Sequence, residues 1–148
     1  YQIRAVLDGL AARLAAKQCG RGEADPEARG ALADALENGE ALIAEADIAR
    51  LVDADVAFHD AIHTLSGNPE ITRTVAEQWP QFMRSMGFVL TGTERAPVIW
   101  RQHRAIAEAF LDGDGETAER LSREHAEAAA RQAVDELTRH QAAIEAEA

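Results

Sequence analysis

The chain has 148 residues, 47% of them hydrophobic, so it can bury one substantial core and falls within the size of a single domain, which we place at 1–148. Fifteen Lys and Arg residues stand against 26 Asp and Glu residues, and the formal charge of -11 argues against binding of nucleic acid or anionic lipid by this fragment alone. The single cysteine, Cys19, excludes an intramolecular disulfide and suits a reducing compartment. No apolar stretch reaches the roughly 20 residues that span a bilayer. We therefore expect a cytoplasmic protein without membrane contact.

Ala, Leu, Glu and Arg dominate the sequence, and apolar residues recur at spacings of three and four rather than two. This pattern predicts an all-α fold, an antiparallel bundle of about six helices. The expected helices span residues 1–18, 26–44, 48–65, 69–90, 96–111 and 116–148.

The first expected helix carries four apolar residues at helical spacing, Ile3, Leu7, Leu10 and Leu14. It starts at the first residue, with neither an initiator Met nor a capping residue before it, so we expect further sequence upstream. A glycine-rich turn at 20–22 ends it, and Pro26, a residue suited to a first helical turn, begins the second helix.

Turn and capping residues delimit the remaining helices. Asp47 is the expected N-cap of the third helix, which ends at the Ser-Gly-Asn-Pro turn of residues 66–69. Pro80 should kink or divide the fourth, because proline lacks the amide proton of the helical ladder. Loops are predicted at 91–93 and 112–115.

A carboxylate interrupts the apolar stripe of the third helix. Asp55 occupies the position that completes the spacing of the apolar residues Ile48, Leu51, Phe58, Ile62 and Leu65. A lone ionised carboxylate in an apolar interior is costly, so it is expected to protonate, pair or bind a cation. His59, four residues further along the same helix face, is its nearest candidate neighbour.

Two other helices repeat this anomaly. His103 lies among Ile99, Ile106 and Phe110 on the fifth helix, and His125 lies among Ala118, Leu121 and Ala128 on the sixth. One carboxylate and three imidazoles from three helices form a donor set for one divalent transition metal. We expect zinc, with Ni, Mn, Fe and Co as alternatives.

Each of these residues also has an explanation that involves no metal. A single histidine on an apolar face is more often a hydrogen-bonded core residue than a ligand, and Asp55 with His59 could form a buried ion pair without metal. His63 is rotated away from the stripe centre and His140 lies in a polar tail, so surface or rim positions are expected for both.

Four segments in order resemble the FCD family, named after the C-terminal domain of FadR. They are the first helix with Arg4 and Asp8, the Asp55-Val-Ala-Phe-His59 and Ser66-Gly-Asn68 segments, the stretch from His103 to Asp114, and His125. In metal-containing members the residues corresponding to Asp55, His59, His103 and His125 are the ligands. Asp8 stands where the family usually has glutamate. With six expected helices, the chain is similar to the VanR-like branch of the family.

The resemblance implies a bacterial GntR-type transcription regulator. Members carry an N-terminal winged helix-turn-helix domain that binds DNA and is absent from these residues, and they are homodimers. The chain would then be a non-enzymatic sensing domain without catalytic residues, which binds a small carboxylate effector and the metal. Arg4 and Asn68 are the expected effector-binding residues, although Arg4 could instead form a surface ion pair with Asp8 and Asn68 could simply cap a turn.

Two rival functions remain open at this point. Three histidines, a carboxylate and an open metal position could also activate water in a helical-bundle hydrolase or transferase. No second inward-facing carboxylate or histidine is evident as a general base, which argues against that activity. The other rival is a dimerisation bundle in which Asp55 and the histidines form a metal-free hydrogen-bond network.

Overall fold

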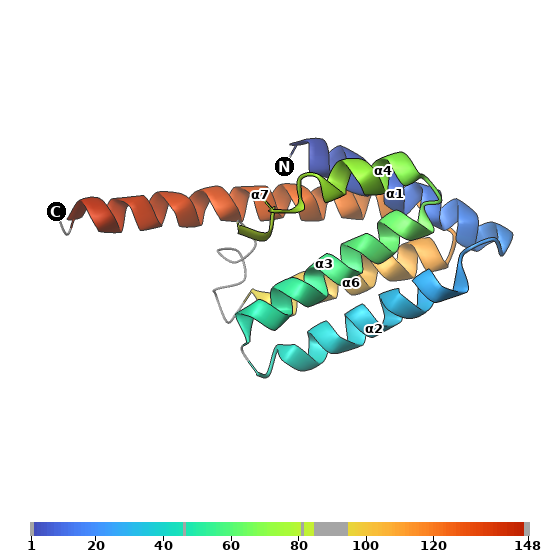
Figure 1. Cartoon of the computed structure of the whole chain (residues 1–148), viewed down its shortest axis with the longest axis horizontal. Helices are drawn as coiled ribbons and strands as arrows, with labels where there is room; N and C mark the ends of the chain where they lie inside the picture. Colours follow the sequence, from blue (N-terminus) through green and yellow to red (C-terminus); the bar gives the residue numbers. More distant parts are fainter. Residues whose placement is uncertain (1, 46, 81, 85–94, 147–148) are drawn as a thin grey trace.

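A computed structural model describes residues 2–45, 47–80, 82–84 and 95–146, and within them the fold is all-α. Six helices are delimited there, namely α1 (Gln2–Arg21), α2 (Pro26–Leu42), α3 (Ile48–Leu65), α4 (Pro69–Ala76), α6 (Ala96–Leu111) and α7 (Gly115–Ala146). Figure 1 shows an antiparallel bundle in which α1 lies along α7 while α2 packs against α3 and α6. Within the described residues, none of the helices has both the length and the apolar character needed to cross a bilayer.

The helix boundaries follow local chemistry. Asp47 caps α3 by accepting a hydrogen bond from the backbone amide of Arg50 at 3.2 Å, as predicted. The α1 helix runs three residues further than expected, and Gly22, with φ of 69°, is the left-handed residue beyond its end. Gly67 and Gly113 take the same conformation at the two predicted turns.

The predicted fourth helix is divided, and the division falls before Pro80. The α4 helix ends at Ala76, residues 77 and 78 form a turn, and the chain is helical again at 79, 80 and 82–84. Pro80 therefore lies in the first turn of a new helical stretch, where its missing amide proton costs little. The predicted helical residues 85–90 and the loop at 91–93 lie outside the described residues.

The buried face of α1 differs from the prediction. Ile3 is 60% exposed and Leu10 is 37% exposed. The buried positions are instead Arg4, Ala5, Asp8, Gly9, Ala11, Ala12, Ala15 and Ala16. Small side chains allow α1 to approach α7 closely, and a Cβ on Gly9 would lie 2.7 Å from Cγ of Arg123. The alanine face thus carries a charged pair, Arg4 and Asp8, into the bundle.

The α7 helix extends well beyond the bundle and ends in the projecting segment seen in Figure 1. The main hydrophobic core lies between α1, α2, α3, α6 and the first half of α7. Three helices that surround this core, α3, α6 and α7, supply the polar residues described next.

Candidate metal centre

The α3 helix places Asp55 and His59 on the face that packs into the bundle. Leu51, Phe58 and Ile62 on the same helix are buried, and Asp55 and His59 are each only 3% exposed. The two residues are one helical turn apart, so their side chains meet, with Asp55 Oδ2 3.7 Å from His59 Nε2. The predicted stripe and its polar interruption are therefore both present.

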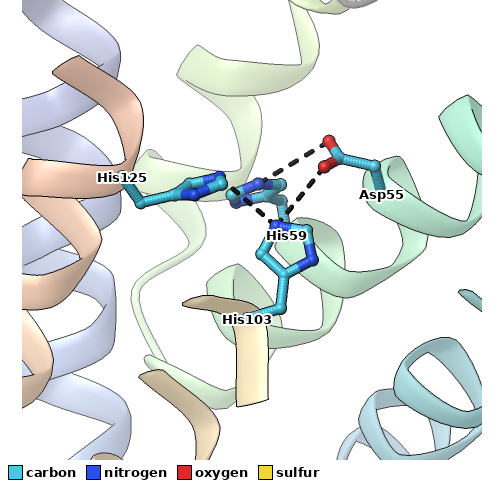
Figure 2. A group of neighbouring side chains, drawn as sticks. All are labelled: Asp55, His59, His103 and His125. Carbon is cyan, nitrogen blue, oxygen red and sulfur yellow. Dashed lines mark hydrogen bonds and ion pairs between the residues drawn. The ribbon is translucent and has the colours of Figure 1, made fainter. Parts of the chain in front are cut away.

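His103 on α6 and His125 on α7 complete the group (Figure 2). His103 Nε2 lies 3.4 Å from Asp55 Oδ1 and 3.3 Å from His125 Nε2. The ring of Phe58 stacks on that of His103, with centroids 4.0 Å apart, and holds this imidazole in its orientation. Residues from three helices thus converge on one point.

The spacing of the donors suits a metal ion. One ligand atom from each of the four residues lies within 4.8 Å of all the others, and all four residues are buried. Metal–nitrogen bonds of about 2.1 Å in a tetrahedral site would put neighbouring donors about 3.4 Å apart. The observed separations of 3.3, 3.4 and 3.7 Å between donor atoms lie close to that value.

Unsatisfied polar atoms provide an independent test of this fit. Asp55 Oδ2 and His59 Nε2 are buried without a hydrogen-bond partner among the described residues. Leaving such atoms unpaired costs about 1–3 kcal/mol each. Both atoms face the interior of the group, so a cation there would satisfy both at once. Without a metal, neither atom has a hydrogen-bond partner in the part of the chain that the structure describes.

Burial sets the protonation states in the direction that metal binding requires. It lowers the pKa of His59 and His103 well below the usual value and that of His125 to about 4, and the positive charge of Arg4 adds to this effect at each. The imidazoles are therefore neutral at pH 7, with lone pairs available. Burial raises the pKa of Asp55 to about 7, although Arg4 opposes the shift. A bound cation would favour its ionised form.

Two further residues lie beside the imidazole nitrogens that face away from the group. His125 Nδ1 donates to Gln102 Oε1 at 2.9 Å, which leaves His125 Nε2 unprotonated and turned toward the group. Asp8 on α1 lies 3.6 Å from His59 Nδ1 through its Oδ2 atom. Neither Gln102 nor Asp8 was expected at the site.

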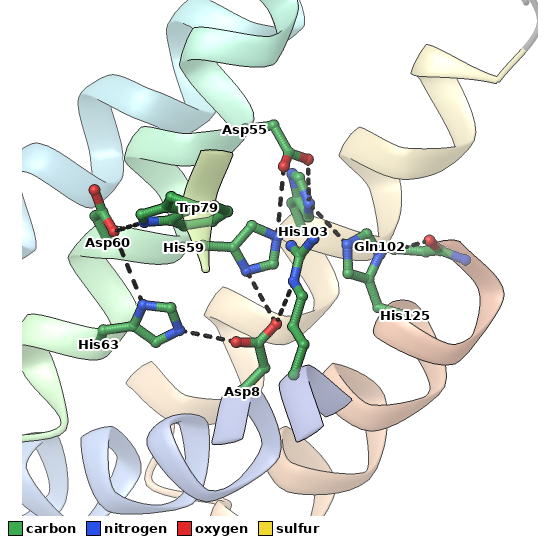
Figure 3. A network of polar contacts seen from close by, with 10 residues as sticks. Asp8, Asp55, His59, Asp60, His63, Trp79, Gln102, His103 and His125 are labelled. Atoms are coloured by element: carbon green, nitrogen blue, oxygen red, sulfur yellow. Dashed lines mark hydrogen bonds and ion pairs between the residues drawn. The ribbon is translucent and has the colours of Figure 1, made fainter. Parts of the chain in front are cut away.

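His63 is buried, and the prediction that it lies at the surface or rim was wrong. It is 1% exposed, and its Nε2 donates to Asp8 Oδ1 at 2.8 Å. Its Nδ1 lies 3.9 Å from Oδ1 of Asp60, the atom that also accepts a hydrogen bond from Trp79 Nε1 at 2.9 Å (Figure 3). Burial lowers the pKa of His63, but the carboxylates of Asp60 and Asp8 outweigh it and raise the pKa overall. His140, by contrast, is exposed on α7.

The two predicted effector-binding residues have different settings. Arg4 is 1% exposed, so the surface position considered for it was wrong, although its ion pair with Asp8 is present, with Nε 3.1 Å from Oδ2. Its guanidinium carbon lies 5.5 Å from the ring centroid of Trp79. Asn68 caps α4 by accepting from the amide of Glu70 at 3.1 Å, the turn-capping position considered for it. An effector-binding role stays a prediction for both.

The buried Asp8 and His63 also correct an argument made from sequence. The expectation that no second carboxylate or histidine faces inward was wrong, because both lie in the interior beside His59. The signal was available in the four-residue spacing of Arg4 and Asp8 on the alanine-rich face of α1, and in the four-residue spacing of Asp55, His59 and His63. The composition of the site therefore does not by itself exclude an enzyme.

A comparison with protein-family models identifies the family of this chain. The FCD domain family matches residues 1–128, which cover every residue of the four-residue group and most of the bundle. No curated protein matches the chain.

Proposed function

Because this chain belongs to the FCD domain family, we propose that it is a metal-dependent sensing domain in which a small organic acid binds beside the Asp55 and histidine group. FCD domains are the effector-binding domains of GntR-type transcription regulators and are not enzymes. The observation that carries the proposal is the buried set of four donor residues with two unsatisfied atoms facing its centre.

The metal in this proposal is a single first-row divalent ion, with zinc expected before Ni, Mn, Fe or Co. Three imidazole nitrogens and one carboxylate suit these ions and leave room in the coordination shell for an exogenous oxygen ligand. When bound, the metal would supply a fixed positive charge that attracts the carboxylate of the effector.

Arg4 is the residue proposed to bind the effector. Its charge is near enough to the group to lower the pKa of Asp55, His59 and His125, and its side chain is buried. A guanidinium in such a setting binds carboxylate more strongly than it would in water, because the low local dielectric strengthens the pairing. Asn68 is proposed as a weaker contributor, since its side-chain oxygen already caps α4.

The proposal also includes a homodimer and a DNA-binding partner domain. Exposed apolar residues lie on α1 (Ile3, Val6 and Leu10) and on the extended part of α7 (Val134, Leu137 and Ile144). Such exposed apolar surface is a candidate for contact with a second copy. Effector binding would select one arrangement of the two copies and thereby the spacing of winged helix-turn-helix domains on a two-fold operator. The VanR-like branch stays a prediction.

A thermal-shift screen of small mono- and dicarboxylates tests the proposal. At least one acid should raise the melting temperature of the metal-loaded protein and leave the chelator-treated protein unchanged. Arg4→Lys keeps the charge but loses the planar guanidinium, so at saturating Zn²⁺ it should bind that acid about tenfold more weakly. Arg13→Lys on the same helix, where the side chain is half exposed, is the control and should bind normally. Equal binding by both variants would remove Arg4 from the proposed site.

A further inference from the structure

Asp8 makes polar contacts with three different residues inside the bundle. Its Oδ2 accepts from Arg4 Nε at 3.1 Å, and its Oδ1 accepts from His63 Nε2 at 2.8 Å. The same Oδ2 atom lies 3.6 Å from His59 Nδ1 (Figure 3). Asp8 therefore connects α1 with the metal group and with the buried end of α3.

Arg4 and His63 keep Asp8 ionised in spite of its burial. Arg4 Nε forms an ion pair with Asp8 Oδ2 at 3.1 Å, and His63 Nε2 donates to Asp8 Oδ1 at 2.8 Å, so each carboxylate oxygen faces a donor. Burial acts to raise the pKa of Asp8, and these two contacts outweigh it, so the pKa lies below its usual value. An ionised carboxylate has only acceptor sites. Any imidazole nitrogen that faces it is stabilised when it carries a hydrogen and destabilised when it presents a lone pair.

This preference decides which nitrogen of His59 can bind a metal. A neutral imidazole has one protonated and one unprotonated nitrogen, so a hydrogen on Nδ1 leaves the lone pair on Nε2. His59 Nε2 is the atom that faces Asp55 Oδ2 at 3.7 Å and has no hydrogen-bond partner among the described residues. The opposite tautomer would turn a lone pair toward Asp8 and a hydrogen toward the centre of the group.

We propose that Asp8 is a positioning residue that selects the Nδ1-protonated tautomer of His59, and that His63 and Arg4 hold the Asp8 carboxylate in place for this task. The inference rests on the proposed metal site and extends it outward to Asp8 and His63, to which the family resemblance assigns no role. At 3.6 Å the contact between Asp8 and His59 is electrostatic and not a formed hydrogen bond, so it is the sign of the charge that carries the preference.

The neighbouring histidine shows the same arrangement with a different partner. His125 Nδ1 donates to Gln102 Oε1, and its Nε2 faces the group. Histidine ligands generally donate their second ring hydrogen in this way, and loss of the acceptor typically weakens metal binding by about 10–100-fold. Asp8 would supply to His59 what Gln102 supplies to His125, with a full negative charge in place of an amide oxygen.

The test combines Zn²⁺ affinity, measured by competition with a chelating dye, and the His59 tautomer, measured by ¹⁵N NMR on the whole chain. Asp8→Asn preserves the volume and removes the charge, and it should weaken Zn²⁺ binding about tenfold or more. Asp8→Glu restores the charge and should bind within about threefold of the unsubstituted protein. Asp53→Asn, an exposed carboxylate on α3, is the matched control and should bind normally.

The NMR spectrum of the unsubstituted protein should show His59 protonated at Nδ1 both with and without Zn²⁺. A hydrogen on Nε2 in the metal-free protein would overturn the inference even if Asp8→Asn fails to fold. Equal affinities for Asp8→Asn and Asp53→Asn would overturn it while leaving the metal site intact. If the unsubstituted protein takes up no metal at all, the proposed function fails, and this inference fails with it.

Discussion

Replacing Asp55 should stabilise the metal-free fold, even though Asp55 is a proposed ligand. Burial raises the pKa of this carboxyl from 3.8 to about 7, so between these two values the carboxyl ionises in the unfolded chain while it stays protonated in the folded chain, and stability falls as the pH rises. A group with a raised folded-state pKa contributes its full stability below the unfolded value, and that stability is lost as the pH rises through the folded value. The shift corresponds to a cost of about 4 kcal/mol at pH 8 and about 2 kcal/mol at pH 5.

Asp55→Asn removes this pH-dependent cost, because the amide does not ionise. Urea unfolding in the presence of chelator should therefore show that the stability of the variant relative to the unsubstituted protein improves by about 2 kcal/mol between pH 5 and pH 8. Effects of the amide that do not depend on pH cancel in this comparison. With Zn²⁺ present the unsubstituted protein should be the more stable of the two, since only it retains all four ligands. A relative stability that stays constant across this pH range would refute the reasoning.

Three further predictions concern proton linkage, packing and assembly. Titration calorimetry in buffers of different ionisation enthalpy should show that Asp55 releases about 0.9 proton on metal binding at pH 6 and about 0.1 at pH 8, and a release that Asp55→Asn leaves unchanged would contradict its assignment. Gly39→Ala should destabilise the fold by about 3 kcal/mol in urea unfolding, because the new Cβ would lie 1.7 Å from Trp100 Nε1. Gly30→Ala on the same helix meets nothing within 4 Å and should stabilise the fold by up to about 1 kcal/mol. Equal effects of the two substitutions would show that α2 and α6 do not pack in this way. Val134→Glu with Leu137→Glu should weaken self-association in sedimentation experiments while Val98→Glu, exposed on α6, should not, and an unchanged oligomer would place the proposed interface elsewhere.

Sequence reasoning succeeded where one physical rule governs a residue. The helical spacing around Asp55, His103 and His125 shows that each lies on an inward face, and the structure brings them together with His59. Caps and left-handed glycines fixed most helix boundaries within a few residues, as Asp47 and Gly67 show. These features depend on neighbours in the sequence, which a single sequence contains.

The failures concern residues whose burial depends on another helix. Ile3 and Leu10 suggested the wrong face of α1, because close packing against α7 favours alanine over larger apolar side chains. Because the wrong face of α1 was predicted to be buried, Asp8 was not recognised as a buried residue. No buried partner could then be predicted for His63. A charged residue on an alanine-rich helix face gives a local signal of burial only when its partner is known.

Metal content is the most direct test of the account. The protein should be purified without a polyhistidine tag or chelator and analysed by elemental mass spectrometry, beside His103→Ala and His140→Ala. The account predicts about one equivalent of a first-row transition metal per chain, retained in His140→Ala, where the histidine is exposed, and lost in His103→Ala. A metal-free protein that also gains no thermal stability from added Zn²⁺, Ni²⁺ or Mn²⁺ would contradict it.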